Sequence, residues 1–150
     1  FILWGEATGA DTILFAEANG LLPETVAFVV AESPYASLRA MAQEHIWKWY
    51  SVPKSFLYAI EGKLNASGAG FRLDDIELAD ALAAGRGDIP VLFLESAQDA
   101  YIRPVWTDPV IESYTGTRET IVGGASHGTV YAAEGEEIEE LLTQWWTLYR

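Results

Sequence analysis

The 150-residue sequence contains no cysteine, which excludes disulfides, thiolate zinc sites and cysteine nucleophiles. Basic residues are few, because 9 Lys and Arg stand against 22 Asp and Glu and the net charge is −13. A surface this acidic repels nucleic-acid phosphates and anionic lipids, so we expect no binding to either. No apolar run approaches the roughly 20 residues that span a bilayer. Cytoplasmic and secreted locations both stay open.

Half of the residues are hydrophobic, which is enough for one core of ordinary size. Short apolar runs predict strands at 1–4, 25–31, 89–94 and 118–122. Helical spacing of apolar residues predicts helices at 10–18, 38–50, 74–84, 105–114 and 138–149. Strands that alternate with helices predict an α/β fold with a mostly parallel sheet of about four strands and flanking helices.

The sequence offers no metal-ligand set. His45 and His127 are far apart in the chain, and the acidic clusters at 74–75 and 134–140 are typical of helix starts and solvated faces. We therefore expect neither a metal nor a cofactor.

The first predicted strand runs into Gly5-Glu6-Ala7-Thr8-Gly9, and helical spacing starts directly afterwards. Taken alone, this segment suits a Gly-rich strand-to-helix turn of any parallel α/β protein. It also resembles the nucleophile elbow of the α/β-hydrolase superfamily, Gly-x-Ser-x-Gly, with Ala7 at the serine position. A methyl group cannot attack a carbonyl carbon, so the resemblance implies a form that makes no acyl-enzyme. Such a form is either a substituted enzyme or a naturally inactive relative.

Polar residues follow the third and fourth predicted strands, at Asp99 and at His127. The order of elbow, acid and histidine is that of α/β-hydrolases. The resemblance implies that His127 is the general base, that Asp99 orients it, and that the backbone N–H of Thr8 belongs to the oxyanion hole. Singly, a loop Asp is more often a turn residue and a lone His more often structural. His45, inside a predicted helix, is expected to be structural.

Gly124-Ala-Ser-His-Gly128 also matches Gly-x-Ser-x-Gly. We do not interpret Ser126 as the nucleophile, because no histidine lies downstream and 129–131 is not expected to open a helix.

Large apolar residues at 47–71 alternate with proline and glycine, which interrupt any long regular element. The resemblance implies a small lid or cap there, in which Trp47, Tyr50 and Phe56 would shape the substrate pocket. The alternative is an ordinary helical excursion that packs on the sheet.

By this resemblance, residues 1–150 form the C-terminal half of an α/β-hydrolase domain, and the sequence starts with Phe1 inside a strand. We expect the N-terminal half of the fold, on a separate chain or a cleaved piece, to cover the edge of strand 1–4.

Three functions remain open. The first is a serine hydrolase of small carboxylic esters or amides that carries Ala7 in place of its nucleophile. The second is a non-catalytic ligand-binding relative, and the third is an acyltransferase that uses the same triad. We favour the first, because the acid and the histidine are both kept.

Overall fold

The computed structural model describes residues 1–51, 53–66, 68, 75–124 and 126–150. These residues form two compact units, one comprising Phe1–Ala36 with Leu78–Arg150 and the other comprising Ser37–Glu77. The predicted helix start at Asp74 and parts of the predicted lid, including Phe71, lie outside the described residues.

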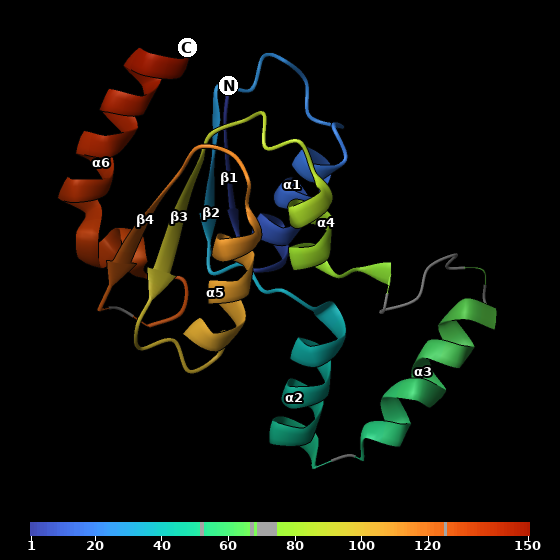
Figure 1. The fold of residues 1–150 in the computed structure, drawn as a ribbon. Helices are drawn as coiled ribbons and strands as arrows, with labels where there is room; N and C mark the ends of the chain where they lie inside the picture. The colour runs from blue at the N-terminus through green and yellow to red at the C-terminus, as the bar shows by residue number, and fades with distance from the viewer. Residues whose placement is uncertain (52, 67, 69–74, 125) are drawn as a thin grey trace. The chain divides into compact units, whose positions relative to one another are not determined.

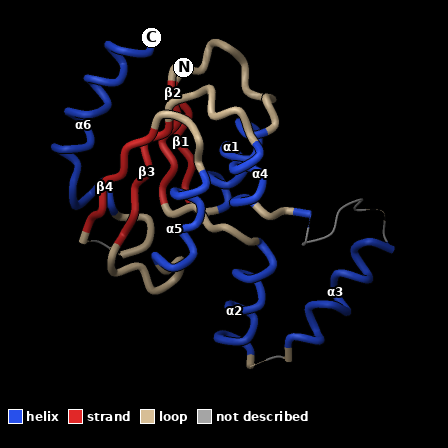
Figure 2. Tube along the Cα trace, viewed as in Figure 1, coloured by secondary structure: helices blue, strands red, loops and turns tan. Residues whose placement is uncertain are grey.

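The larger unit is built on a four-stranded parallel sheet in the order β1-β2-β3-β4, seen in Figures 1 and 2. The strands are β1 (Ile2–Glu6), β2 (Phe28–Glu32), β3 (Val91–Ser96) and β4 (Arg118–Gly123). The predicted α/β class and the four parallel strands are confirmed. Because the strands are parallel, their carboxyl ends all meet at one edge of the sheet.

Helices cover both faces of this sheet. One face carries α1 (Thr8–Ala18), α4 (Leu78–Ala84) and α5 (Pro104–Ser113), and the other carries α6 (Val130–Tyr149), as Figure 1 shows. Successive residues of β2 therefore enter two different apolar clusters: Val29 and Ala31 pack on the side of α1, and Phe28 and Val30 on the side of α6. Burial on both faces explains why β2 and β3 are continuously apolar at their centres.

The smaller unit contains α2 (Leu38–Tyr50) and α3 (Lys54–Ala66). Ser37 caps α2, because its Oγ accepts the N–H of Ala40 at 3.2 Å. His45 lies inside α2, where its Nδ1 is 2.9 Å from the carbonyl oxygen of Met41. The sequence did not predict α3, since Pro53 and Gly62 suggested interruptions. The predicted lid, 47–71, falls within this unit, and its role remains a prediction.

The last helix starts earlier than predicted. α6 begins at Val130, so the expectation that 129–131 opens no helix is wrong. The early start was missed because α6 has a kink at Glu134 (φ −115°, ψ 25°), directly before Gly135. The kink breaks the helical spacing, so the apolar residues before and after it do not share one periodic pattern. In the described part of the chain, no helix has both the length and the apolar character required to cross a membrane.

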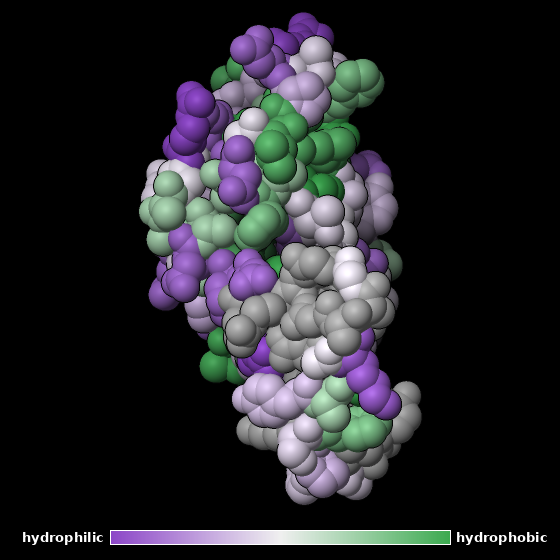
Figure 3. Space-filling model, turned by 90° about the vertical axis from the view of Figure 1, so that its right-hand side faces the viewer, coloured by the Kyte–Doolittle hydropathy of each residue, from purple (hydrophilic) through white to green (hydrophobic). Residues whose placement is uncertain are grey.

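The strand β1 forms one edge of the sheet. Its side chains Ile2 and Trp4 are 39% and 40% exposed, and Phe1 before it is 75% exposed. Figure 3 shows that hydrophobic residues also gather on the surface seen from the right of Figure 1. Apolar side chains on an unpaired strand edge invite pairing with another strand.

Candidate active site

Ala7 joins β1 to α1 in a strained conformation. Its φ of 50° and ψ of −119° lie in a region that residues with a side chain rarely adopt. Two backbone hydrogen bonds fix it: the Ala7 N–H donates to the carbonyl of Glu32 at 2.9 Å, and the Ala7 carbonyl accepts from the N–H of Asp11 at 3.0 Å. The surrounding structure therefore holds the turn, and strain of this kind gathers at functional sites.

Close packing of α1 on β1 requires Gly5. A Cβ atom at this position would lie 2.5 Å from the carbonyl carbon of Gly9 and 2.6 Å from the nitrogen of Ala10. At Gly9, by contrast, a Cβ would meet nothing within 4 Å. Packing thus accounts for the first glycine of the motif and not for the second.

Asp99 lies in the loop after β3 and is 4% exposed. Its Oδ1 accepts the N–H groups of Tyr101 and Ile102, each at 2.7 Å, and its Oδ2 lies 2.7 Å from Nδ1 of His127. A carboxylate only accepts, so Nδ1 carries the proton in this hydrogen bond. The second ring nitrogen, Nε2, is then the basic atom that faces away from Asp99.

His127 lies in the loop between β4 and α6. Its Nε2 is 3.6 Å from Oε1 of Glu6, the residue directly before Ala7. The structure therefore brings together Asp99 and His127, and it brings His127 to the end of β1 where Ala7 lies. The ring of Tyr101 is 5.0 Å from the imidazole, centroid to centroid.

A buried glutamate anchors this loop. Oε1 of Glu32, at the end of β2, accepts the N–H of Val130 at 3.2 Å, only three residues after His127. Burial raises the pKa of Glu32, and the charge of Glu6, its register partner on β1, raises it further. The start of α6 is thereby tied to the carboxyl edge of the sheet.

Thr8 is the first residue of α1, so its N–H is among the donors that lack a partner within the helix. Its Oγ1 lies 3.0 Å from the hydroxyl of Tyr35. Tyr35 in turn donates its N–H to Oδ1 of the buried Asp11 at 2.9 Å. Sequence reasoning missed Tyr35 and Asp11; a carboxylate three residues before Leu14, on the apolar side of the helix, was the available signal.

The predicted pocket residues belong to the smaller unit and not to the unit that carries Ala7, Asp99 and His127. Trp47 and Phe56 belong to the smaller unit, where they are 58% and 50% exposed, and the side chain of Tyr50 lies outside the described part. Ser126 is exposed, and its Oγ is 3.3 Å from Oγ1 of Thr129.

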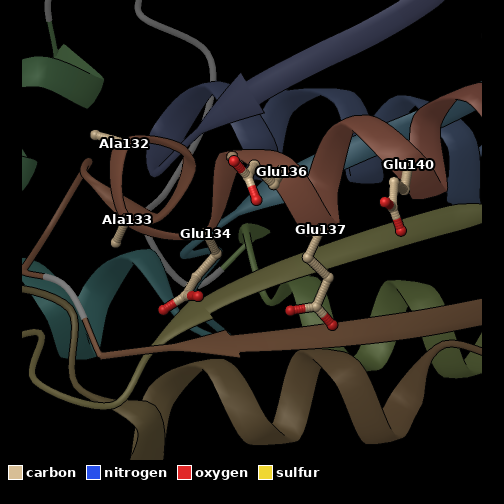
Figure 4. Close-up of a pocket in the computed structure, with 7 residues that line it drawn as sticks. Ala132, Ala133, Glu134, Glu136, Glu137 and Glu140 are labelled. Carbon is tan, nitrogen blue, oxygen red and sulfur yellow. The ribbon is translucent and has the colours of Figure 1, made fainter.

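A separate acidic surface lies on α6. A cavity of about 640 Å³ is lined there by glutamates and small residues, shown in Figure 4. The glutamates are Glu134, Glu136, Glu137 and Glu140. No group of three or more His, Cys, Asp or Glu suited to a metal ion occurs among the residues that the structure describes.

No protein-family model matches the chain, and no curated protein matches it either. Several solved structures, however, match the chain. An esterase from Pyrococcus furiosus matches with a TM-score of 0.67 and 14% identity, over 99% of this chain and 53% of that one. An acetyl xylan esterase from Paenibacillus sp. R4 matches with a TM-score of 0.62 and 13% identity, over 99% and 45%.

A lipase-esterase related protein from Clostridium acetobutylicum matches with a TM-score of 0.61 and 17% identity, over 96% of this chain and 65% of that one. The chain thus spans about half to two thirds of the length of these structures. Identities this low establish the fold alone. The chain has the α/β-hydrolase fold and covers part of it.

Proposed function

We propose that this chain carries the acid and base of a serine hydrolase of carboxylic esters or amides, with Ala7 in the nucleophile position. The observation that carries the proposal is the 2.7 Å hydrogen bond from His127 to Asp99, with Nε2 of His127 turned toward the end of β1. The strained backbone of Ala7 supports it, because the methyl group stands at the tip of a tight strand-to-helix turn.

Each residue has a role in the proposed reaction. In an Ala7→Ser form, Nε2 of His127 takes the serine proton while Oγ bonds to the carbonyl carbon of a small-molecule substrate. The N–H of Thr8 stabilises the oxyanion, and Asp99 stabilises the imidazolium. His127 then protonates the leaving alcohol or amine, and water releases the acyl group by the same steps. The chain with Ala7 lacks the hydroxyl and forms no acyl-enzyme.

Restoring the hydroxyl tests the proposal. We expect Ala7→Ser in the full-length protein to hydrolyse a short p-nitrophenyl ester and to be labelled by a fluorophosphonate, and we expect Ala7→Ser/His127→Ala to do neither. The matched control is Ser126→Ala, which should leave activity in the Ala7→Ser form unchanged. A folded Ala7→Ser protein without turnover or labelling would contradict the proposal.

Ala7 itself favours a second candidate, a ligand-binding protein without catalysis. It predicts that an ester or carboxylic acid binds to the Ala7 protein, that His127→Ala weakens this binding, and that Ala7→Ser adds no turnover. Analysis of the products of an active Ala7→Ser form, with water and with an alcohol acceptor, distinguishes a hydrolase from an acyltransferase.

Two further parts of the proposal concern partners and substrate. The exposed apolar edge of β1 suits pairing with the N-terminal half of the fold, on a separate chain or a cleaved piece. In β1 the N–H groups of Ile2 and Trp4 face the open edge, because they alternate with those that bond to β2. Slow exchange of these two amides in the native full-length protein would support the pairing, and fast exchange of both would contradict it.

For the smaller unit we propose the role of a lid, in which Trp47, Tyr50 and Phe56 bind an apolar part of the substrate. Their exposed aromatic surface supports this role for Trp47 and Phe56. Trp47→Ala and Phe56→Ala should raise KM for long or aromatic esters more than for acetate esters. Equal effects on both ester classes would count against a lid.

A further inference from the structure

Tyr35 is almost completely buried and contacts the first turn of α1 at two points. It is 2% exposed, its hydroxyl lies 3.0 Å from Oγ1 of Thr8, and its N–H donates to Oδ1 of Asp11 at 2.9 Å. Among the described residues, Tyr35 belongs to neither apolar cluster of the larger unit. The hydroxyl of this buried side chain contacts the elbow at Thr8.

The turn after β2 brings Tyr35 to this place. Ser33 has a positive φ of 48°, and its N–H donates to the carbonyl of Leu94 at 2.9 Å. One residue earlier, the carbonyl of Glu32 accepts the N–H of Ala7 at 2.9 Å. The segment from Glu32 to Tyr35 thus holds the elbow through a backbone bond to Ala7 and through two side chains of α1.

These contacts restrain the direction of the Thr8 N–H. That group's orientation depends on the backbone angles of Ala7 and Thr8, and no residue of the helix accepts from it. An oxyanion donor acts only when it points at the developing charge, and losing one such donor costs about 100-fold to 1000-fold in kcat. A donor that is present but misaligned should lower kcat by a smaller factor.

We propose that Tyr35 is a positioning residue that aligns the backbone N–H of Thr8 as an oxyanion donor, by holding the Thr8 hydroxyl and the Asp11 carboxyl. The inference rests on the proposed function. Burial and the charge of Asp11 raise the pKa of Tyr35 to about 12, so its hydroxyl keeps its proton throughout the pH range of an assay.

A double-mutant cycle in the Ala7→Ser protein tests this role. We expect Tyr35→Phe and Thr8→Val each to lower kcat about tenfold with KM changed less than twofold. The double variant should lose no more than either single variant, because both remove the same hydrogen bond. Independent, multiplying losses would contradict the proposal.

Tyr114→Phe is the matched control. Tyr114 is also buried, but its hydroxyl contacts Glu17 and the carbonyl of Ile89, just before the start of β3, whereas His127 follows the end of β4. This variant should lower the free energy of unfolding and leave kcat unchanged. Equal losses of kcat in Tyr35→Phe and Tyr114→Phe would mean that Tyr35 acts only through stability.

A second measurement separates this inference from the proposed function, since it needs no turnover. In the Ala7 protein, Tyr35→Phe should accelerate exchange of the Asp11 amide, which donates to Ala7, by about tenfold. Tyr114→Phe should not change it. If the Ala7→Ser protein shows no turnover but Tyr35→Phe accelerates this exchange, the hydrolase is rejected and the restraint of the elbow by Tyr35 is kept. Unchanged exchange would reject the positioning role itself.

Discussion

Asp99 binds His127 with one carboxylate oxygen and the backbone of its own loop with the other. Oδ2 lies 2.7 Å from Nδ1 of the imidazole, while Oδ1 accepts the N–H groups of Tyr101 and Ile102. The carboxylate therefore has two separable tasks, which are the shape of the loop and the orientation of the imidazole.

Substitution of Asp99 should separate the two tasks. Asp99→Ala leaves two N–H groups without an acceptor, one of them on the buried Ile102, and should lower the free energy of unfolding by about 2–3 kcal/mol. Asp99→Asn keeps an acceptor for these groups and should lose less than half as much. Its amide donates toward His127, so the imidazole should change tautomer, which ¹⁵N NMR of the ring nitrogens detects. Equal destabilisation by both variants would contradict this division.

A second prediction concerns Asp11. Burial raises the pKa of this carboxyl from 3.8 to about 7, so the folded protein favours the protonated form. The stability that protonation contributes is complete below pH 3.8 and is lost as the pH rises through 7.

Asp11→Asn keeps the acceptor for the Tyr35 N–H without a charge. Compared with the unchanged protein, it should be more stable at pH 8, by up to about 4 kcal/mol, and equally stable at pH 4. Urea denaturation at the two pH values measures this. Asp80→Asn, on the exposed side of α4, is the control and should change stability by less than about 0.5 kcal/mol at either pH.

The sequence pattern was sufficient to predict the sheet, and the resemblance to α/β-hydrolases was needed to predict that Asp99 lies beside His127. Apolar runs alternating with helical spacing leave few options other than parallel strands, and parallel strands bring the loops after β3 and β4 to one edge. The predicted strand boundaries differ from the observed ones where an apolar residue is buried in the core but lies outside the strand. Val26, for example, lies before β2 and is still buried in the cluster on the side of α1.

Contacts between polar groups far apart in the chain were not predictable. Tyr35 and Asp11 are 24 residues apart, and nothing in the local pattern of either marks the hydrogen bond between them. The early start of α6 was hidden for a different reason, because the kink at Glu134 divides one helix into two segments with separate phases. The proximity of Glu6 to His127 likewise depends on the tertiary fold.

The strain at Ala7 gives a third prediction. A positive φ of 50° with ψ of −119° costs a residue with a Cβ about 1–3 kcal/mol, and glycine is free of this cost. Ala7→Gly should therefore raise the free energy of unfolding by about 1 kcal/mol, after the entropy that glycine loses on folding. Ala10→Gly, in the buried first turn of α1, is the matched control and should lower it by a similar amount or more. A loss of stability in Ala7→Gly would show that the turn is unstrained.

Gly5 and Gly9 give the fourth prediction, because the same substitution should have opposite effects at the two glycines of the elbow. In Gly5→Ala the new methyl group would lie 2.5–2.6 Å from backbone atoms of Gly9 and Ala10, and backbone atoms cannot rotate away as a side chain can. We expect α1 to be displaced from β1 and the free energy of unfolding to fall by about 3 kcal/mol or more.

In Gly9→Ala the methyl group meets open space, and the better helix propensity of alanine should raise stability by up to about 1 kcal/mol. Thermal and urea denaturation of the two variants side by side measure this contrast. If Gly5→Ala is too unstable to purify, Gly5→Ala in the stabilised Ala7→Gly background, compared with Gly9→Ala in the same background, keeps the contrast measurable. A Gly5 variant as stable as its Gly9 counterpart would refute the close crossing of α1 over β1.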